Sequence, residues 1–190
     1  TNKIWGQRMK SKPSYLLTKI NASIDIDKKL YVQDIKASIA HAKMLAKQKI
    51  IKKDKSNKII IGLKKIEKEI QQKKFKFSVF DEDIHLNIEK RLFEIIGNDA
   101  GFLHIARSRN DQVTTDFKLW TIDASNALKI EIKNLIKAIL KLAEKNKSVI
   151  MPGFTHLKNA QPVLFSHYLL AYIEMFKRDY KKFNNVINNS

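Results

Sequence analysis

The chain has 190 residues and no cysteine, which excludes a disulfide framework and thiolate chemistry and fits a reducing compartment. It has no apolar run near the roughly 18 residues that cross a bilayer, and TNKIWGQRMKSKP lacks the apolar core of a signal peptide, so we expect a soluble, cytoplasmic protein with no membrane partner. The net charge of +18 is compatible with a nucleic-acid binder, but the lysines are spread along helix faces without interleaved aromatics, so we predict a solvated surface and no nucleic-acid partner.

The whole chain has only five glycines and three prolines, so few residues interrupt regular structure. Helices are therefore predicted through its first half. Asp25 or Asp27 is expected to cap a helix that runs to about Ile50. Ser56 is expected to cap the next helix, in which apolar residues recur at helical spacing.

A third helix is predicted to start at Asp83 and to end at Gly97, since glycine is favoured just past the end of a helix. Ahead of it, Phe75–Phe80 alternates apolar and polar residues. This alternation favours a short extended segment.

A long helix is predicted from Asn110 to about Lys147, where an apolar stripe continues without proline or glycine. About 38 residues at ~1.5 Å each span roughly 57 Å, which is typical of an oligomeric bundle. MPGFTHLKNAQP then predicts a loop, and a second long helix is expected to start at Pro162. The apolar pattern of this second helix continues to Ser190, so we interpret the chain as the N-terminal piece of a longer protein.

These patterns together predict an all-α fold. An N-terminal helical domain is expected over residues 1–109. The first long helices of a central helical bundle are expected over residues 110–190, with the C-terminal part of that bundle missing from this sequence.

DEDIHLNIE is the first of three clusters of polar residues that do not fit a solvated helix face. His85 and Glu89 lie four residues apart, so the carboxylate is expected to orient the imidazole. The same pattern also arises from a capping residue, here Asp83, followed by a surface ion pair. The residues alone leave both interpretations open.

HIARSRNDQ, the second cluster, contains two of the five arginines in the chain. Arg107 and Arg109 lie just before the long helix, with Asn110 or Asp111 as its expected N-cap. The backbone N–H groups at a helix N-terminus favour the binding of an anion. A guanidinium can bind a carboxylate through two hydrogen bonds. Arginines beside a cap also often pair with a nearby carboxylate, such as Asp99 or Asp111, so spacing alone does not decide.

PGFTHLKNAQP, the third cluster, places Thr155 and His156 in the predicted loop and Gln161 at the expected cap of the next helix. A hydroxyl beside a histidine at a helix start can bind a carboxylate and move a proton, although a loop histidine is commonly only a surface residue. The three clusters suit a small-molecule substrate with several carboxylates. The sequence contains no metal-ligand spacing, glycine-rich phosphate loop or GxSxG motif, so we predict neither a metal nor a cofactor.

A family resemblance is carried by ARSRNDQVTTDFKLW and MPGFTHLKNAQPVLFSHYLLAYIEMFKRD. They resemble the first two shared regions of the argininosuccinate lyases, which belong to the all-helical aspartase/fumarase superfamily. NASIDIDKKLYVQDIKASIAHAKMLAKQ and EDIHLNIEKRLFEIIG resemble that family's N-terminal part. The resemblance implies a homotetramer with active sites shared between subunits. It also implies a step of arginine biosynthesis, the reversible cleavage of argininosuccinate to arginine and fumarate without a cofactor.

The resemblance further implies roles for residues at matching positions. His156 is the expected acid or proton relay, and His85 is a supporting residue near the site. The family's third region, a GSSxMPxKxN loop that supplies the catalytic base, does not occur in these 190 residues, so the chain alone is expected to be inactive. Substrate contacts are expected from Ser23, Asp83, Arg107, Arg109, Asn110, Thr155 and Gln161.

Three positions depart from the family pattern. Ile105 replaces a threonine, Gln7 stands where a glycine is usual, and Ser166 replaces another glycine. Two alternatives remain: a catalytically silent, crystallin-like structural relative, or another fumarate-releasing lyase of the superfamily. A purely structural role would not need the residues that the resemblance assigns to the site, among them Asp83, Asn110, Thr155 and His156.

Overall fold

The computed structural model describes residues 14–190 of the chain, so Gln7 lies outside the described residues. The chain divides into two compact units within one long helix. The first unit extends to Phe117 and the second covers Lys118–Ser190. Among the helices of residues 14–190, none combines the length and the hydropathy that a bilayer crossing requires.

The first unit is built from helices and short 3-10 turns, which confirms the predicted helical class. The elements in chain order are α1 (Tyr15–Asn21), α2 (Ile24–Asp27), η2 (Lys28–Leu30), α3 (Tyr31–Lys47), α4 (Lys53–Gln71), η3 (Val79–Asp81), α5 (Ile84–Ile96), η4 (Gly97–His104) and the start of α6 (Arg109–Lys145).

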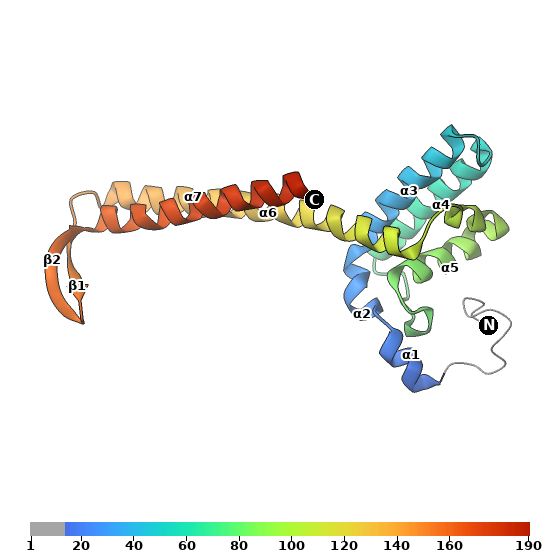
Figure 1. Cartoon of the computed structure of the whole chain (residues 1–190), viewed down its shortest axis with the longest axis horizontal. Coiled ribbons are helices and arrows are strands. Elements are labelled where there is room, and N and C mark those ends of the chain that lie inside the picture. Colours follow the sequence, from blue (N-terminus) through green and yellow to red (C-terminus); the bar gives the residue numbers. More distant parts are fainter. Residues whose placement is uncertain (1–13) are drawn as a thin grey trace. The chain divides into compact units, whose positions relative to one another are not determined.

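The core of the first unit lies between α3, α4 and α5, which pack together (Figure 1). Each helix turns one apolar face inward, and each fully buried aliphatic side chain contributes about 1.5–3 kcal/mol. Gly62 lets α4 approach α5 closely, since a Cβ there would lie 2.5 Å from Leu92 Cδ1. The largest fully buried aliphatic side chains are Ile24, Ile35, Leu45, Ile59, Leu63, Ile66, Ile84, Ile88 and Leu92.

The first predicted helix is interrupted, because α2 and η2 precede α3. The predicted cap is wrong: neither Asp25 nor Asp27 caps α3, whose N-cap position is Leu30. Asp27 instead ties α2 to the start of α5. Its Oδ1 accepts a hydrogen bond from the N–H of Ile84 at 3.1 Å, and its Oδ2 accepts one from the Ser23 hydroxyl.

One further local prediction is wrong. Ser56 lies inside α4, and its buried hydroxyl donates to the carbonyl of Ala42 on α3 at 2.9 Å instead of capping the helix. The predicted extended segment at Phe75–Phe80 is non-helical as far as Ser78, where the backbone is extended, and within the described residues it pairs with no strand. The rings of Phe75 and Phe77 contact each other with centroids 4.8 Å apart, and η3 takes up the end of the segment.

The ends of α5 agree with their prediction. Asp83 Oδ1 accepts a hydrogen bond from the N–H of Leu86 at 2.7 Å, which satisfies one of the unpaired donors of the first turn. Gly97 follows the last turn with φ of +66°, a left-handed conformation that glycine adopts without strain.

The long helix α6 is also confirmed, but the predicted loop after it is a β-hairpin. β1 (Ile150–Thr155) and β2 (Lys158–Leu164) pair antiparallel. His156 and Leu157 form the turn with φ values of 49° and 61°, the positive pair that a two-residue hairpin turn requires. Pro152 pairs with Pro162; prolines are tolerated here because both strands of a two-stranded ribbon are edge strands.

α7 (Phe165–Asn189) follows the hairpin. The predicted helix start at Pro162 is therefore wrong, and Gln161 lies in β2 instead of capping a helix. Figure 1 shows the hairpin at the end where α6 passes into α7.

Side chains join α7 to α6 within the second unit. The ring of Tyr180 lies 5.0 Å from Lys129 Nζ and 5.3 Å from Lys133 Nζ, distances at which a cation is attracted to the face of an aromatic ring. Ser166, where the family usually has glycine, donates a hydrogen bond to the carbonyl of Lys147 at 3.4 Å. The departure at Ser166 thus adds a contact between the start of α7 and the turn after α6.

Candidate functional site

Arg109 begins α6 and contacts three side chains of the first unit. Its Nη1 donates to Glu89 Oε1 at 3.1 Å and to Gln112 Oε1 at 3.0 Å. Its Nε lies 3.4 Å from Asp83 Oδ2. A planar guanidinium has donors enough to hold all three acceptors at once.

Asp83 and Ser23 lie in the same region. One oxygen of Asp83 caps α5 and the other faces Arg109. The backbone N–H of Ser23 donates at 2.9 Å to the carbonyl of Glu82, the residue before Asp83. Ser23 and Arg109, which come from separate segments of the chain, therefore both contact the Glu82–Asp83 segment.

Arg107 anchors the turn before α6 to α3. Its Nη1 donates to Ser38 Oγ at 2.8 Å. The alternative that the arginines pair with Asp99 is wrong, because Asp99 lies 2.6 Å from Lys55 Nζ and 3.0 Å from Lys58 Nζ.

Ser108 caps α6, so the predicted cap at Asn110 or Asp111 is wrong. The Ser108 hydroxyl accepts a hydrogen bond from the N–H of Asn110 at 3.2 Å, and the Asp111 carboxylate accepts one from the N–H of Ser108 at 3.4 Å. This reciprocal arrangement is a capping box. Because Ser108 supplies the cap, the exposed amide of Asn110 is not required for it.

His85 is buried, with 1% of its surface exposed, and the predicted pairing with Glu89 is wrong. Its Nδ1 donates to Asp34 Oδ1 at 2.9 Å and lies 3.6 Å from Asp116 Oδ2. Glu89 faces Arg109 instead. The ring of His85 thus contacts α3 and α6, not the neighbouring turn of its own helix.

Asp34, Gln112 and Asp116 complete a buried polar cluster with His85 that the sequence reasoning missed. The Gln112 Nε2 donates to Asp34 Oδ1, and Asp34 and Asp116 are 1% and 0% exposed. Two signals were available in the sequence. Asp34 adjoins the apolar face of its helix, and Gln112 and Asp116 lie four residues apart, so they share one face of α6.

Burial is the main electrostatic influence in this cluster. It raises the pKa of Asp116 to about 8, with a further increase from the charge and hydrogen bond of Asp34 and an opposing effect of Arg107 and Arg109. Burial also acts to raise the pKa of Asp34, but the hydrogen bond and charge of His85, together with hydrogen bonds of Gln112 and Asp116, hold that pKa below its usual value. At neutral pH, Asp34 is therefore ionised and Asp116 carries a proton.

The same three groups have the composition of a cation site, since one ligand atom each from Asp34, His85 and Asp116 lie within 4.8 Å of one another. Two observations disfavour a metal cation in this place. The Nδ1 of His85 is already hydrogen-bonded to Asp34, and the positive charges of Arg107 and Arg109, which also lower the pKa of Asp116, would repel a cation.

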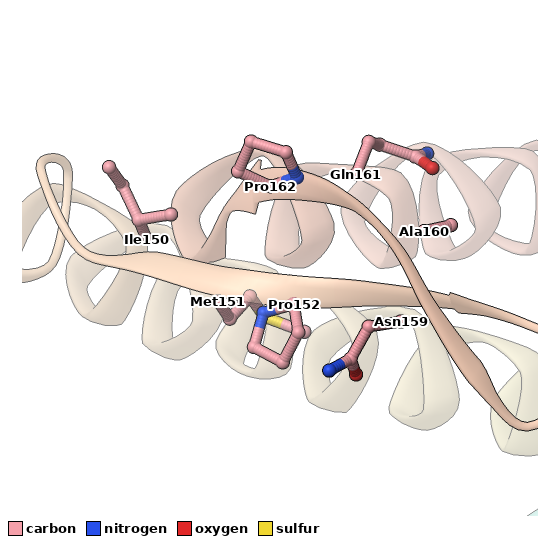
Figure 2. Close-up of a pocket in the computed structure, with 7 residues that line it drawn as sticks. All are labelled: Ile150, Met151, Pro152, Asn159, Ala160, Gln161 and Pro162. Atoms are coloured by element: carbon pink, nitrogen blue, oxygen red, sulfur yellow. The ribbon is translucent and has the colours of Figure 1, made fainter.

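The remaining predicted site residues belong to the second unit. Thr155 ends β1 opposite Lys158, and His156 lies in the turn; both are exposed. Gln161 lines an open hollow along the hairpin, together with residues of both strands (Figure 2). Thr155 and His156 are not among the residues that line it.

Ile105, the departure that replaces a threonine, has a structural role. Its carbonyl accepts a hydrogen bond from His41 Nε2 at 3.0 Å. Its side chain packs against the core of the first unit, so an apolar contact takes the place of the hydroxyl.

Comparison with known proteins gives close relatives in sequence. A family model described as "Lyase" matches residues 7–190. The argininosuccinate lyase of Pelagibacter ubique is 60% identical over 180 residues, which cover 95% of this chain and 39% of that protein. The argininosuccinate lyase of Bartonella bacilliformis is 50% identical over 187 residues, which cover 98% of this chain and 40% of that protein. The chain thus spans about two fifths of the length of these relatives.

Solved structures share the fold. An EDDS lyase variant with bound fumarate superposes with a TM-score of 0.74 at 24% identity, over 88% of this chain and 32% of that chain. A structure described as fumarate lyase:delta crystallin from Brucella melitensis gives a TM-score of 0.73 at 17% identity, over 88% of this chain and 43% of that chain. At these identities, the likeness establishes the arrangement of helices only.

Proposed function

The chain belongs to the lyase family, and on this premise we propose that it is the N-terminal part of an argininosuccinate lyase, which reversibly cleaves argininosuccinate to arginine and fumarate. The observation that carries the proposal is the 60% identity to the Pelagibacter enzyme over 95% of this chain. The complete enzyme is proposed to be a cytoplasmic homotetramer whose active sites are shared between subunits. This chain then supplies only part of each site.

The first unit supplies one wall of the proposed substrate site. Ser23, Asp83 and Asn110 are the proposed contacts. Arg109 shapes this wall, because its guanidinium holds Asp83 at 3.4 Å and adds positive charge beside the N-terminus of α6. Arg107 supports the same turn through Ser38.

The hairpin supplies a second set of groups. Thr155 is proposed to bind substrate and His156 to act as the acid or proton relay. Support comes from the turn, whose two positive φ values present His156 at the exposed tip. Gln161, on the opposite strand, supports the hairpin and contacts substrate.

The proposed reaction is an elimination without a cofactor. A base from the remainder of the enzyme removes a proton from the carbon next to a carboxylate, and the resulting negative charge gathers on the carboxylate oxygens. The C–N bond then breaks while an acid protonates the departing guanidino nitrogen, which gives the guanidinium of arginine. Fixed hydrogen-bond donors around the carboxylate favour this path, because they stabilise charge where it develops.

A chimera tests the proposal. Residues 1–190 replace the matching segment of the Pelagibacter enzyme, and fumarate release from argininosuccinate is followed at 240 nm. We expect cleavage by the chimera and none by the 190-residue chain alone. A folded chimera that releases no fumarate would instead favour the catalytically silent relative. A chimera that prefers EDDS to argininosuccinate would favour another fumarate-releasing lyase.

A further inference from the structure

Asp116 occupies an unusual position for a carboxyl group. Its side chain on α6 is 0% exposed, and within residues 14–190 neither of its oxygens accepts a hydrogen bond from an N–H or hydroxyl donor. Its Oδ2 lies 3.6 Å from His85 Nδ1, the atom that donates to Asp34. A buried carboxylate without donors is costly, so the group needs another way to be satisfied.

A proton on Asp116 satisfies it. Two carboxylates that face one imidazole nitrogen in a buried site disfavour the doubly ionised state, because like charges repel strongly where water is excluded. A protonated Asp116 can donate its O–H to Asp34. Asp34 then keeps its charge and accepts from Asp116, His85 and Gln112 together, which leaves one negative charge in the cluster instead of two.

We propose that Asp116 is a positioning residue that acts as a neutral hydrogen-bond donor to Asp34 and so fixes Arg109, through Gln112, in the substrate-binding wall. The connection is continuous: Gln112 donates to Asp34 and accepts from Arg109 Nη1 at 3.0 Å. Arg109 in turn faces Asp83. The inference rests on the proposed function, because Asp83 and Arg109 matter as parts of that site.

The cluster also joins three helices at one point. Asp34 comes from α3, His85 from α5, and Gln112 and Asp116 from successive turns of α6. Ionisation of Asp116 would place a second negative charge beside Asp34 and remove the O–H that Asp34 accepts. Arg109 would then lose the rigid support of Gln112, which predicts weaker substrate binding.

The test compares Asp116→Asn with Asp116→Ala in the chimera. Asparagine has the shape of the protonated acid and an N–H₂ donor, so we expect kcat/KM within about 2-fold of the parent. Alanine removes the donor, so we expect a loss of about 10- to 100-fold, mostly as a rise in KM. If Asp116→Asn is as damaging as Asp116→Ala, an ionised carboxylate is required and the proposal is wrong.

A thermal measurement decides the same point without activity. The groups that face Asp116 are Asp34 from α3, His85 from α5, Arg107 from the turn before α6, and Arg109 at the start of α6. These groups are present in both proteins. Their own contributions to the pH dependence of stability therefore largely cancel when the parent is compared with Asp116→Asn. Burial and Asp34 raise the pKa of Asp116 above its unfolded value, so the native parent loses stability as the pH rises from about 4 to about 8.

The melting temperature of Asp116→Asn should therefore rise relative to that of the parent between pH 5 and pH 8. A difference that is independent of pH would overturn the proposal, whether or not the chimera is active. An inactive parent chimera with a pH-dependent difference would contradict the proposed function and leave Asp116 as a neutral donor. An active parent with a constant difference would contradict only the role of Asp116.

Discussion

The two groups of proposed site residues differ in how the chain holds them. Around Arg109, each charged group meets a partner within the first unit, and His85 and Asp116 are enclosed between three helices. At the hairpin tip, Thr155 and His156 are exposed, and Leu157 beside them is 98% exposed. The first group is therefore positioned by the chain itself. The second group, in the proposed enzyme, gains its surroundings from the rest of the tetramer.

The largest expected effect is on stability, from Asp34→Ala in the first unit. This change leaves the donors of His85 and Gln112 without their acceptor, so the free energy of unfolding of the chain should fall by about 3–5 kcal/mol. Urea unfolding followed by circular dichroism measures it. Asp25→Ala, at an exposed position, is the control and should change stability by less than about 0.5 kcal/mol. Equal effects of the two changes would show that the buried cluster around Asp34 contributes no more stability than an exposed position, which would contradict the firm positioning of the first group.

His156→Ala should show the opposite behaviour. The side chain is exposed in the turn, so stability should change by less than about 0.5 kcal/mol, whereas fumarate release by the chimera should fall at least about 100-fold. His167→Ala, an exposed position on α7, serves as the control for activity. A large loss of stability, or an unchanged rate, would show that the hairpin tip is structural.

Gly62→Ala tests how tightly the first unit is packed. The added Cβ would lie 2.5 Å from Leu92 Cδ1, so either the buried Leu92 side chain must move or α4 and α5 must shift apart, at a cost of about 2 kcal/mol in the free energy of unfolding. Gly101→Ala meets nothing within 4 Å and is the matched control. If neither change alters the free energy of unfolding, the core can accommodate an added methyl group, and the close approach of α4 and α5 does not depend on Gly62.

Ser108→Ala should have the smallest of these effects. It removes the hydroxyl that caps α6, so the free energy of unfolding should fall by about 1 kcal/mol. The substrate affinity of the chimera should weaken slightly, because Asn110 lies in that first turn. Ser148→Ala, exposed in the turn after α6, is the control. A loss of activity far larger than the loss of stability would assign Ser108 itself to the site.

Much of the fold was predictable because it follows from local signals. The apolar stripe of α6, the cap at Asp83 and the glycine after α5 each act within one helix. The hairpin was not predicted, because Pro152 and Pro162 read as loop residues and only their pairing across the ribbon makes them strand residues. The interruption before α3 was missed for a similar reason, since Asp27 binds the distant N–H of Ile84.

The candidate site was predictable only in part. Family motifs marked Asp83, Arg109 and His156, but partners depend on which face of each helix is buried. Spacing favoured a His85–Glu89 pair, yet the ring of His85 turns toward Asp34 on α3. Contacts between residues 51 positions apart in the chain have no local sequence signal. The best local indication of such a buried contact is a charged residue beside the apolar face of its helix.

The most direct test of the account is a crystal structure of the chimera with bound fumarate. We predict that the fumarate carboxylates contact Asn110 and Thr155, with Arg109 still paired to Asp83 and His156 beside the ligand. Fumarate bound without either Asn110 or Thr155 would contradict the central claim that this chain supplies two walls of an argininosuccinate lyase active site.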